Sequence, residues 1–231
     1  MQLTPIKHTR GIRYAKLTIN LPNLSVVIPT LNEADTLQNC LESLKEAPGE
    51  IILVDGGSTD DTISIAKKNN CRALVTTPGR GEQLAVGAEA STKTWMLFLH
   101  ADTILDEGWQ NNVGAFMELS CNQNKAAAFT YRVDLRSLSA RVMEKWVMMR
   151  SNLGMTYGDQ GLLINRKHYH EIGGYKKLPL MEDVDLCLRI GLRNISVINS
   201  SAVTSGRRYK NSWIFIRGLR NFICMIFFIK L

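Results

Sequence analysis

Short apolar runs alternate with helical patterns through the first half of the chain. Each run is bounded by polar or turn-forming residues, which is typical of a strand buried on both faces of a sheet. The runs occupy residues 24–28, 51–54, 73–75 and 95–99. The segment after the first run shows one apolar helix face. Its positions are Leu37, Cys40, Leu41 and Leu44. This alternation predicts an α/β fold with a mostly parallel, Rossmann-like sheet and helices on both faces.

The second half of the chain is less regular but contains the same kinds of element. The predicted strands are 126–133, 162–164 and 195–198, and the predicted helices are 137–150, 169–175 and one entered at 180–183. We also expect Pro29 to end the first strand. No internal repeat or linker interrupts the pattern. We therefore predict one domain over residues 24–204, with an irregular basic leader at 1–23 and a basic, apolar tail at 205–231.

The basic excess is confined to the two ends of the chain. The formal net charge is +7, yet residues 1–22 hold four basic residues and residues 204–231 hold six, with no acid in either segment. A nucleic-acid-binding domain would instead cluster Lys and Arg over its folded body, so no nucleic-acid partner is expected. Basic ends suit phosphate contacts or an anionic membrane surface.

Cysteine usage and hydropathy bear on where the protein acts. The five cysteines are scattered without a C-x-x-C pair, which favours reduced thiols and a cytoplasmic protein. No secretory apolar segment opens the chain, and no run of 18 apolar residues is present. Residues 213–231 mix basic and apolar side chains as an interfacial helix does. We expect them to contact the membrane surface peripherally or, alternatively, to pack on the domain or a second subunit.

Polar loops follow the first two predicted strands, at the sheet edge where α/β folds bind nucleotides. Pro29 and Glu33 belong to the loop P-T-L-N-E, and Asp55 opens the loop D-G-G-S-T-D. Asp55 could accept from a base N–H, and Glu33 could reach ribose hydroxyls. The alternative is that these residues form helix caps and turns.

Arg80 lies between two glycines in the segment G-R-G. Glycines allow close approach of the backbone to a ligand, and a guanidinium offers a planar fork for phosphate. We therefore expect Arg80 to contact a diphosphate, with an exposed turn as the alternative.

His100 and Asp102 share one face at the end of the strand 95–99, because positions i and i+2 point the same way. A carboxylate there can bind a hard cation, which then takes diphosphate oxygens as further ligands. The expected cofactor is Mn²⁺ or Mg²⁺, held by Asp102. The alternative is a buried histidine followed by a helix-capping aspartate.

Glu182 and Asp183 follow an apolar segment, and one of the two carboxylates could act as general base toward an acceptor hydroxyl. A negative first turn that favours the helix dipole is the alternative. Tyr157, Asp159 and Gln160 are predicted contacts of the acceptor or donor sugar, or otherwise members of an ordinary loop.

The order P-T-L-N-E, D-G-G-S-T-D, G-R-G, H-A-D and M-E-D resembles the family 2 glycosyltransferases, over about residues 24–199. The resemblance implies a GT-A nucleotide-diphospho-sugar-binding fold, a divalent metal and inversion at the anomeric carbon. It assigns the metal to Asp102 and the base to Asp183. It places nucleotide contacts on Pro29, Glu33, Asp55 and Arg80.

Three features depart from the family pattern or narrow it. His100 stands where the family has the first acid of its D-x-D motif, which leaves the role of that position open. The family's Q-x-x-R-W segment is missing, and 205–209 is a partial substitute that would place Arg207 on the diphosphate. The H-A-D-T, Y-G-D-Q-G and P-L-M-E-D-V-D-L stretches are similar to the arsenosugar-biosynthesis or radical-SAM-associated glycosyltransferases.

The sequence thus predicts an inverting, metal-assisted glycosyltransferase that takes a nucleotide-diphosphate sugar as donor. A nucleotidyltransferase is a second possibility, but it would carry a glycine-rich loop with an arginine after the first strand, where this chain has P-T-L-N-E. A third is a non-catalytic nucleotide-sugar-binding, membrane-docking protein. The presence of Asp102, Asp183 and Arg80 together disfavours it.

Overall fold

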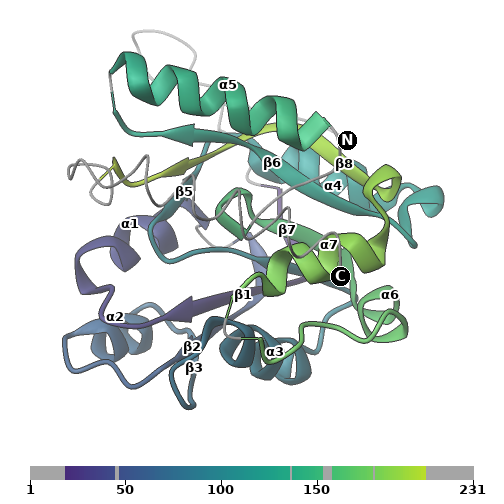
Figure 1. Ribbon diagram of the computed structural model, residues 1–231. Helices are drawn as coiled ribbons and strands as arrows, with labels where there is room; N and C mark the ends of the chain where they lie inside the picture. Colours follow the sequence, from purple (N-terminus) through teal and green to yellow (C-terminus); the bar gives the residue numbers. More distant parts are fainter. Residues whose placement is uncertain (1–18, 45–46, 136, 153–157, 179, 207–231) are drawn as a thin grey trace, which may run out of the picture.

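The computed structural model describes residues 19–44, 47–135, 137–152, 158–178 and 180–206 (Figure 1). The strands are β1 (Leu21–Thr30), β2 (Pro48–Asp55), β3 (Arg72–Val75), β4 (Trp95–Phe98), β5 (Thr103–Leu105), β6 (Ala126–Val133), β7 (Leu162–Asn165) and β8 (Ile195–Thr204). The helices are α1 (Ala34–Leu44), α2 (Thr62–Lys68), α3 (Arg80–Ala90), α4 (Trp109–Glu118), α5 (Leu138–Asn152), α6 (Arg166–Glu171) and α7 (Glu182–Ile190). Three short 3-10 turns complete the elements: η1 (Ser120–Asn122), η2 (Gly158–Gln160) and η3 (Leu192–Asn194).

The described strands form one sheet in the order β3-β2-β1-β4-β7-β6-β8-β5. The first four are parallel to one another, and β7 runs antiparallel between β4 and β6. β6 and β8 are again parallel, and β5 is antiparallel to β8 at the edge. The predicted mostly parallel α/β sheet is confirmed, and among the described strands β7 and the edge strand β5 run in the opposite direction.

Helices cover both faces of this sheet, as the sequence predicts (Figure 1). Alternate residues of β4 point to opposite faces. Leu97 packs with the buried residues of α1, α2 and α4, whereas Phe98 packs with those of α3, α6 and α7. A smaller cluster lies between α5 and the end of β6. The sheet is therefore the middle of three layers.

The close packing of α3 on the sheet depends on Gly87. A Cβ atom at Gly87 would lie 2.3 Å from Val27 Cγ1 and 3.0 Å from Val54 Cγ2. The helix therefore lies close against β1 and β2, which fixes the place of its first residue, Arg80.

The structure corrects the prediction that Pro29 ends the first strand. β1 continues to Thr30, and Pro29 is paired with Val54. Val27 accepts a backbone bond from Leu99 on the β4 side, so Pro29, two residues on, also directs its backbone toward that side. The last residue of β4 is Phe98, opposite Val27. The N–H that proline lacks therefore falls beyond the β4 ladder, where no bond is needed.

Two further element predictions differ from the structure. The helix expected at 169–175 is α6, which starts at Arg166 because the Asn165 side chain accepts from the N–H of Lys167 and of His168 and caps it. β5 was not predicted from the sequence; it is three residues long and pairs with the end of β8, about a hundred residues later.

Candidate functional site

The carboxyl ends of β1, β2 and β4 meet at one sheet edge, and the predicted donor residues lie there. Asp55 ends β2, and its buried carboxylate accepts from Thr30 Oγ1 (3.0 Å) across to β1. It also accepts from the N–H groups of Gly57 (2.8 Å) and Ser58 (2.7 Å). In this structure Asp55 shapes the turn after β2, so the turn-forming alternative describes its contacts.

The loops after β1 and β2 are tied to each other by side chains. Asn32 Oδ1 accepts from the Thr59 N–H (2.9 Å), and Asp60 Oδ2 accepts from the Ala34 N–H (3.0 Å). Hydrogen bonds, chiefly from Thr62, lower the pKa of Asp60. The two loops therefore form one connected rim.

Glu33 takes part in the start of α1. Its N–H donates to Thr62 Oγ1 (2.9 Å), and its Oε2 accepts from Thr36 Oγ1 (2.9 Å). The carboxylate is half-buried at the same rim as Asp55. Pro29 lies within β1, as described above.

Asp102 lies between β4 and β5, immediately before the first residue of β5, and is 5% exposed. Its carbonyl oxygen accepts from the Ser205 N–H (3.0 Å), which connects it to the end of β8. The carbonyl of the neighbouring His100 accepts from the thiol of Cys40 on α1 (3.5 Å). Burial, and then the charge of Asp102, raise the pKa of Cys40. Asp102 is thus a buried charge at the edge where β4 and β8 end.

Asp159 and Gln160 both lie in η2, but their side chains and backbones make different contacts. The Asp159 carbonyl accepts from Thr204 Oγ1 (3.5 Å), one residue before the β8 contact to Asp102. Burial raises the pKa of Asp159; the charges of Asp183 and Asp102 add to this, whereas Arg150 and Arg80 oppose it. Asp159 therefore shares one electrostatic environment with both predicted functional aspartates.

Gln160 is enclosed, with 1% of its surface exposed. Its amide nitrogen donates to the Phe129 carbonyl (3.0 Å), and its oxygen accepts from Ser151 Oγ (3.0 Å) and from Arg150 Nη2 (3.4 Å). These bonds connect η2 with α5 and β6. Tyr157 and Arg207, two other predicted site residues, lie outside the described residues.

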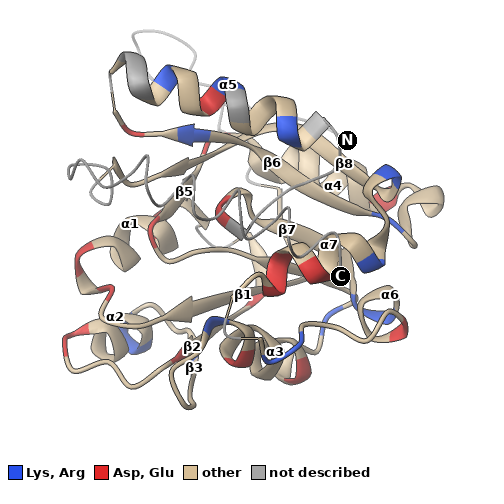
Figure 2. Ribbon diagram, viewed as in Figure 1, with Lys and Arg blue, Asp and Glu red and all other residues tan. Residues whose placement is uncertain are grey.

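Arg80, Glu182 and Asp183 come together from elements about a hundred residues apart. Arg80 Nε donates to Glu182 Oε1 in a short ion pair, and Arg80 Nη2 lies 3.4 Å from Asp183 Oδ2. Both acids belong to the first turn of α7, where acidic residues gather (Figure 2). Negative charge there also suits the helix dipole. Two roles were predicted for this turn: negative charge that favours the helix dipole, and an acid pair in a functional site. The two roles are compatible with each other.

Two neighbouring carboxylates stabilise the charged form of Arg80. Burial opposes the charge on the guanidinium, but Asp183 and Glu182 outweigh it, so the pKa of Arg80 is raised. Burial, and then the charge of Asp183, raise the pKa of the neighbouring Tyr175. Asp183 Oδ1 accepts from the Val184 N–H (2.9 Å).

A second charged network, which the sequence analysis did not single out, supports this turn. Asp185 accepts from Lys176 Nζ (3.0 Å) and from Arg189 Nε (2.9 Å). Arg189 also donates to the carbonyls of Ile172 and Gly174 (both 2.6 Å). The i, i+4 spacing of Asp185 and Arg189 is the signal that could have predicted the pair.

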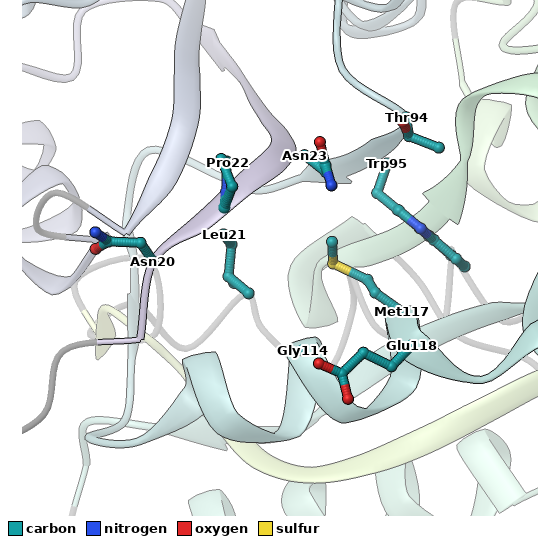
Figure 3. A pocket seen from close by; sticks show the side chains of 9 residues that line it. All are labelled: Asn20, Leu21, Pro22, Asn23, Thr94, Trp95, Gly114, Met117 and Glu118. Carbon is teal, nitrogen blue, oxygen red and sulfur yellow. The ribbon is translucent and has the colours of Figure 1, made fainter. Parts of the chain in front are cut away.

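A pocket of about 330 Å³ lies at the other edge of the sheet, at the amino ends of β1 and β4 (Figure 3). Its walls include Leu21, Trp95, Met117 and Glu118. None of the predicted site residues lines it, so this pocket is separate from the carboxyl-edge site.

The comparison with known families decides how this arrangement is interpreted. The model of a family described as glycosyl transferase family 2 matches residues 25–169, more than half of the chain. The chain belongs to this family. The matched region runs from β1 to α6 and includes Asp55, Arg80 and Asp102.

Relatives in glycosyl transferase family 2 cover part of the chain. A PGL/p-HBAD biosynthesis glycosyltransferase of Mycobacterium bovis (strain BCG / Pasteur 1173P2) is 39% identical over 103 residues, 37% of this chain and 38% of that protein. Glycosyltransferase AglE of Haloferax volcanii is 31% identical over 105 residues, 40% of this chain and 34% of that protein. The chain thus matches less than half of the length of these relatives.

Solved structures share the fold. Glucosyl-3-phosphoglycerate synthase from Mycobacterium tuberculosis, in complex with Mn²⁺ and UDP-glucose, has a TM-score of 0.61 at 20% identity, covering 88% of this chain and 78% of that chain. TarS 1-349 of S. aureus, in complex with UDP-GlcNAc, has a TM-score of 0.61 at 18% identity, covering 80% and 59%. These likenesses confirm the GT-A type of α/β fold.

Proposed function

We propose that this protein is an inverting glycosyltransferase that moves a sugar from a nucleotide-diphosphate sugar to an acceptor hydroxyl. The observation that carries the proposal is the placement of Asp102 after β4 and Asp183 in the first turn of α7, both within electrostatic reach of Asp159. Membership of glycosyl transferase family 2 supports it. The structural neighbours bound to UDP-glucose and UDP-GlcNAc make a UDP-sugar the first donor to test.

The residues at the end of β4 fit a divalent cation that is shared with the donor. Asp102 is a buried carboxylate whose charge is felt by both Asp159 and Cys40, so this corner holds negative charge that a cation would balance. The described residues contain no cluster of three His, Cys, Asp or Glu side chains able to hold a metal ion by itself. Mg²⁺ and similar ions commonly bind through one or two carboxylates plus substrate phosphates. Asp102 would therefore hold the ion jointly with the donor, and the bound ion would neutralise the departing diphosphate.

Asp183 is the general base of the proposed reaction. The acceptor hydroxyl gives its proton to Asp183 Oδ2 as its oxygen forms a bond to the anomeric carbon. The bond between that carbon and the diphosphate oxygen breaks on the opposite face, and its electron pair leaves with the diphosphate. Because Val184 N–H holds Oδ1, the orientation of the carboxylate is fixed before the acceptor arrives.

Two narrower points belong to this proposal. Three sequence stretches are similar to arsenosugar-biosynthesis or radical-SAM-associated glycosyltransferases, and membership of that subgroup stays a prediction. Peripheral membrane contact through 213–231 also stays a prediction, because that segment lies outside the described residues. Among the described helices, none is long and apolar enough to cross a membrane.

Thermal unfolding with and without donors tests the proposal. We expect UDP, UDP-glucose or UDP-GlcNAc to raise the unfolding midpoint in the presence of MnCl₂, since a ligand that binds only the folded state stabilises it. GDP, CDP and dTDP with their sugars are screened in parallel to identify the nucleotide. No stabilisation by any nucleotide, with or without metal, would contradict the donor site.

Asp102→Asn tests the metal within the same experiment. We expect it to weaken Mn²⁺-dependent UDP binding by at least roughly tenfold, since even outer partners of metal ligands are worth 10–100-fold. Isothermal titration with and without EDTA measures this. The matched control is Asp61→Asn at the N-cap of α2, whose side chain makes no cap hydrogen bond. Equal UDP affinity in the two variants would overturn the role of Asp102.

A further inference from the structure

Arg80 bridges Asp183, the proposed general base, and the neighbouring acid Glu182. Its Nε donates to Glu182 Oε1, and its Nη2 lies 3.4 Å from Asp183 Oδ2. The side chain of Glu182 is 2% exposed and that of Asp183 is 11% exposed, whereas that of Arg80 is 40% exposed. One guanidinium therefore approaches two largely buried carboxylates from the solvent side.

We infer that Arg80 is the positioning residue of the general base, anchored by Glu182 and acting on Asp183 through its charge and its orientation. The inference rests on the proposed function of Asp183. It assigns Glu182 the role of anchor and leaves proton transfer to Asp183 alone.

The unequal contacts of Arg80 explain this division. A buried carboxylate such as Glu182 is costly unless it is paired, and its ion pair with Arg80 supplies the partner. The contact to Asp183 is longer and involves only Oδ2, since Oδ1 accepts from the Val184 N–H. The carboxylate of Asp183 is thus oriented beside a cation that is held mainly by the neighbouring Glu182.

The backbone on both sides of the ion pair constrains where Arg80 lies. Arg80 follows Gly79 as the first residue of α3, and a Cβ atom at Gly81 would lie 2.7 Å from the Lys176 carbonyl oxygen. The first turn of α3 therefore abuts the segment that leads to α7. At the other side, Met181 adopts φ 64° immediately before Glu182, which turns the chain into the helix. Two helix starts are fixed against each other, and Arg80 spans them.

The charge on Arg80 is consistent with this role. The pKa of Arg80 is raised because Asp183 and Glu182 outweigh the opposing effect of burial. Their mutual attraction means that removing either partner changes the other. Without Arg80, the carboxylates of Glu182 and Asp183 would lie side by side with no cation beside them, whereas Glu182→Gln would leave Asp183 beside the cation without a second negative charge.

The inference is tested by the pH dependence of kcat, which substitutions of Arg80 and of Glu182 should shift in opposite directions. UDP release from UDP-glucose with MnCl₂ is followed against pH in wild type, Arg80→Gln, Arg80→Lys and Glu182→Gln. We expect Arg80→Gln to lower kcat about 10- to 100-fold and to move the acidic limb to higher pH, with UDP affinity within threefold of wild type. Glu182→Gln should move the acidic limb to lower pH. Arg80→Lys should restore the position of the limb but only part of kcat, because it keeps the charge and loses the two-pronged contact.

A double-mutant cycle on protein stability provides the second measurement, and it needs neither donor nor acceptor. Unfolding midpoints are compared for wild type, Arg80→Gln, Asp183→Asn and the double variant. We expect the double variant to lose less than the sum of the single losses, and this coupling to shrink as the pH is lowered and carboxylates take up protons. Additive losses at pH 7 would overturn the inference.

The outcomes separate this inference from the proposed function. If Arg80→Gln weakens UDP binding tenfold or more and leaves the acidic limb in place, Arg80 is a diphosphate ligand and the inference is wrong, while Asp183 can still be the base. If Asp183→Asn turns over UDP-glucose at the wild-type rate, the proposed function itself is wrong.

Discussion

The two halves of the carboxyl-edge site are held together by different forces. On the donor side, the loops after β1 and β2 are joined by short hydrogen bonds among Asn32, Thr59, Asp60 and Ala34. On the α7 side, the ties are ion pairs, such as that of Arg80 with Glu182. In the first set the carboxylate of Asp60 accepts from neutral donors, whereas in the second set carboxylates are paired with a cation. We therefore expect both halves to weaken at acid pH, and the α7 side to be the more sensitive of the two to pH.

The difference matches what each side must do. A donor site that presents backbone and fixed side chains to a nucleotide gains from preorganisation. A general base must change its protonation state during each turnover, so the charges beside it influence when it accepts a proton. Each of the following substitutions changes either the donor side or the α7 side of the site.

The largest expected effect is the loss of the base. Asp183→Asn should lower the rate of sugar transfer by about 10²–10⁴, the usual contribution of general acid–base catalysis, with UDP affinity nearly unchanged. Turnover of UDP-sugar in single-turnover assays measures it. The control Asp61→Asn, on the donor side, should stay within about twofold of wild type. Equal losses in both variants would mean that the two halves do not differ in this way.

A smaller effect is expected at the ion-pair network behind α7. Asp185→Asn should cost about 3 kcal/mol of unfolding free energy at pH 7, because it leaves the largely buried Arg189 without its carboxylate. Burial opposes the charge of Asp185, but bonds from Lys176 and Arg189 outweigh it and lower the pKa of Asp185.

The lowered pKa of Asp185 determines how its contribution to the free energy of unfolding changes with pH. The stabilisation is fully present above the unfolded-state pKa of about 4 and is lost as pH falls through the lower folded-state pKa. Chemical unfolding of wild type and Asp185→Asn at pH 7, 5 and 3 should show the difference shrinking toward zero. A difference that stays constant with pH would assign it to packing.

The smallest effect should come from the donor rim. Asp60→Ala removes acceptors of the Ala34 and Thr62 N–H groups. Loss of such a cap should lower the unfolding midpoint by about 2–3 °C in a domain of this size. Differential scanning calorimetry measures it, with Asp61→Asn again as control. A loss as large as that of Asp185→Asn would erase the contrast between the halves.

Local patterns in the sequence predicted most of the fold. The apolar positions Leu37, Cys40, Leu41 and Leu44 are all buried on α1, and the strand expected at 126–133 is β6. Failures occurred where distant contacts decide. β5 forms only because the end of β8 lies beside it, and Pro29 continues β1 because β4 ends opposite Val27.

The site was predicted as a set of residues but not as a set of contacts. Asp102, Arg80 and Asp183 were each selected from local motifs, and the structure places them in one region. The pairing of Arg80 with Glu182 spans 102 residues, and no local spacing encodes it. The enclosure of Gln160 depends likewise on Phe129 and Ser151, which lie on other elements.

The reversed strand β7 has a consequence for how such proteins diversify. Because β7 is antiparallel to both β4 and β6, the chain leaves β6 at the catalytic edge and returns to the same edge at the start of β7. The connection from 134 to 161, which includes α5, therefore begins and ends at the same edge of the sheet, although β6 runs six residues beyond Ala127, the partner of Leu163 on β7. Connections of this kind tolerate changes of length and content while the strands that bracket them stay in place. Under the proposed function, exchange of this one segment, matched to the side chains Tyr131 and Val133 that pack with α5, would change the predicted acceptor side and leave the loops after β1 and β2 as they are.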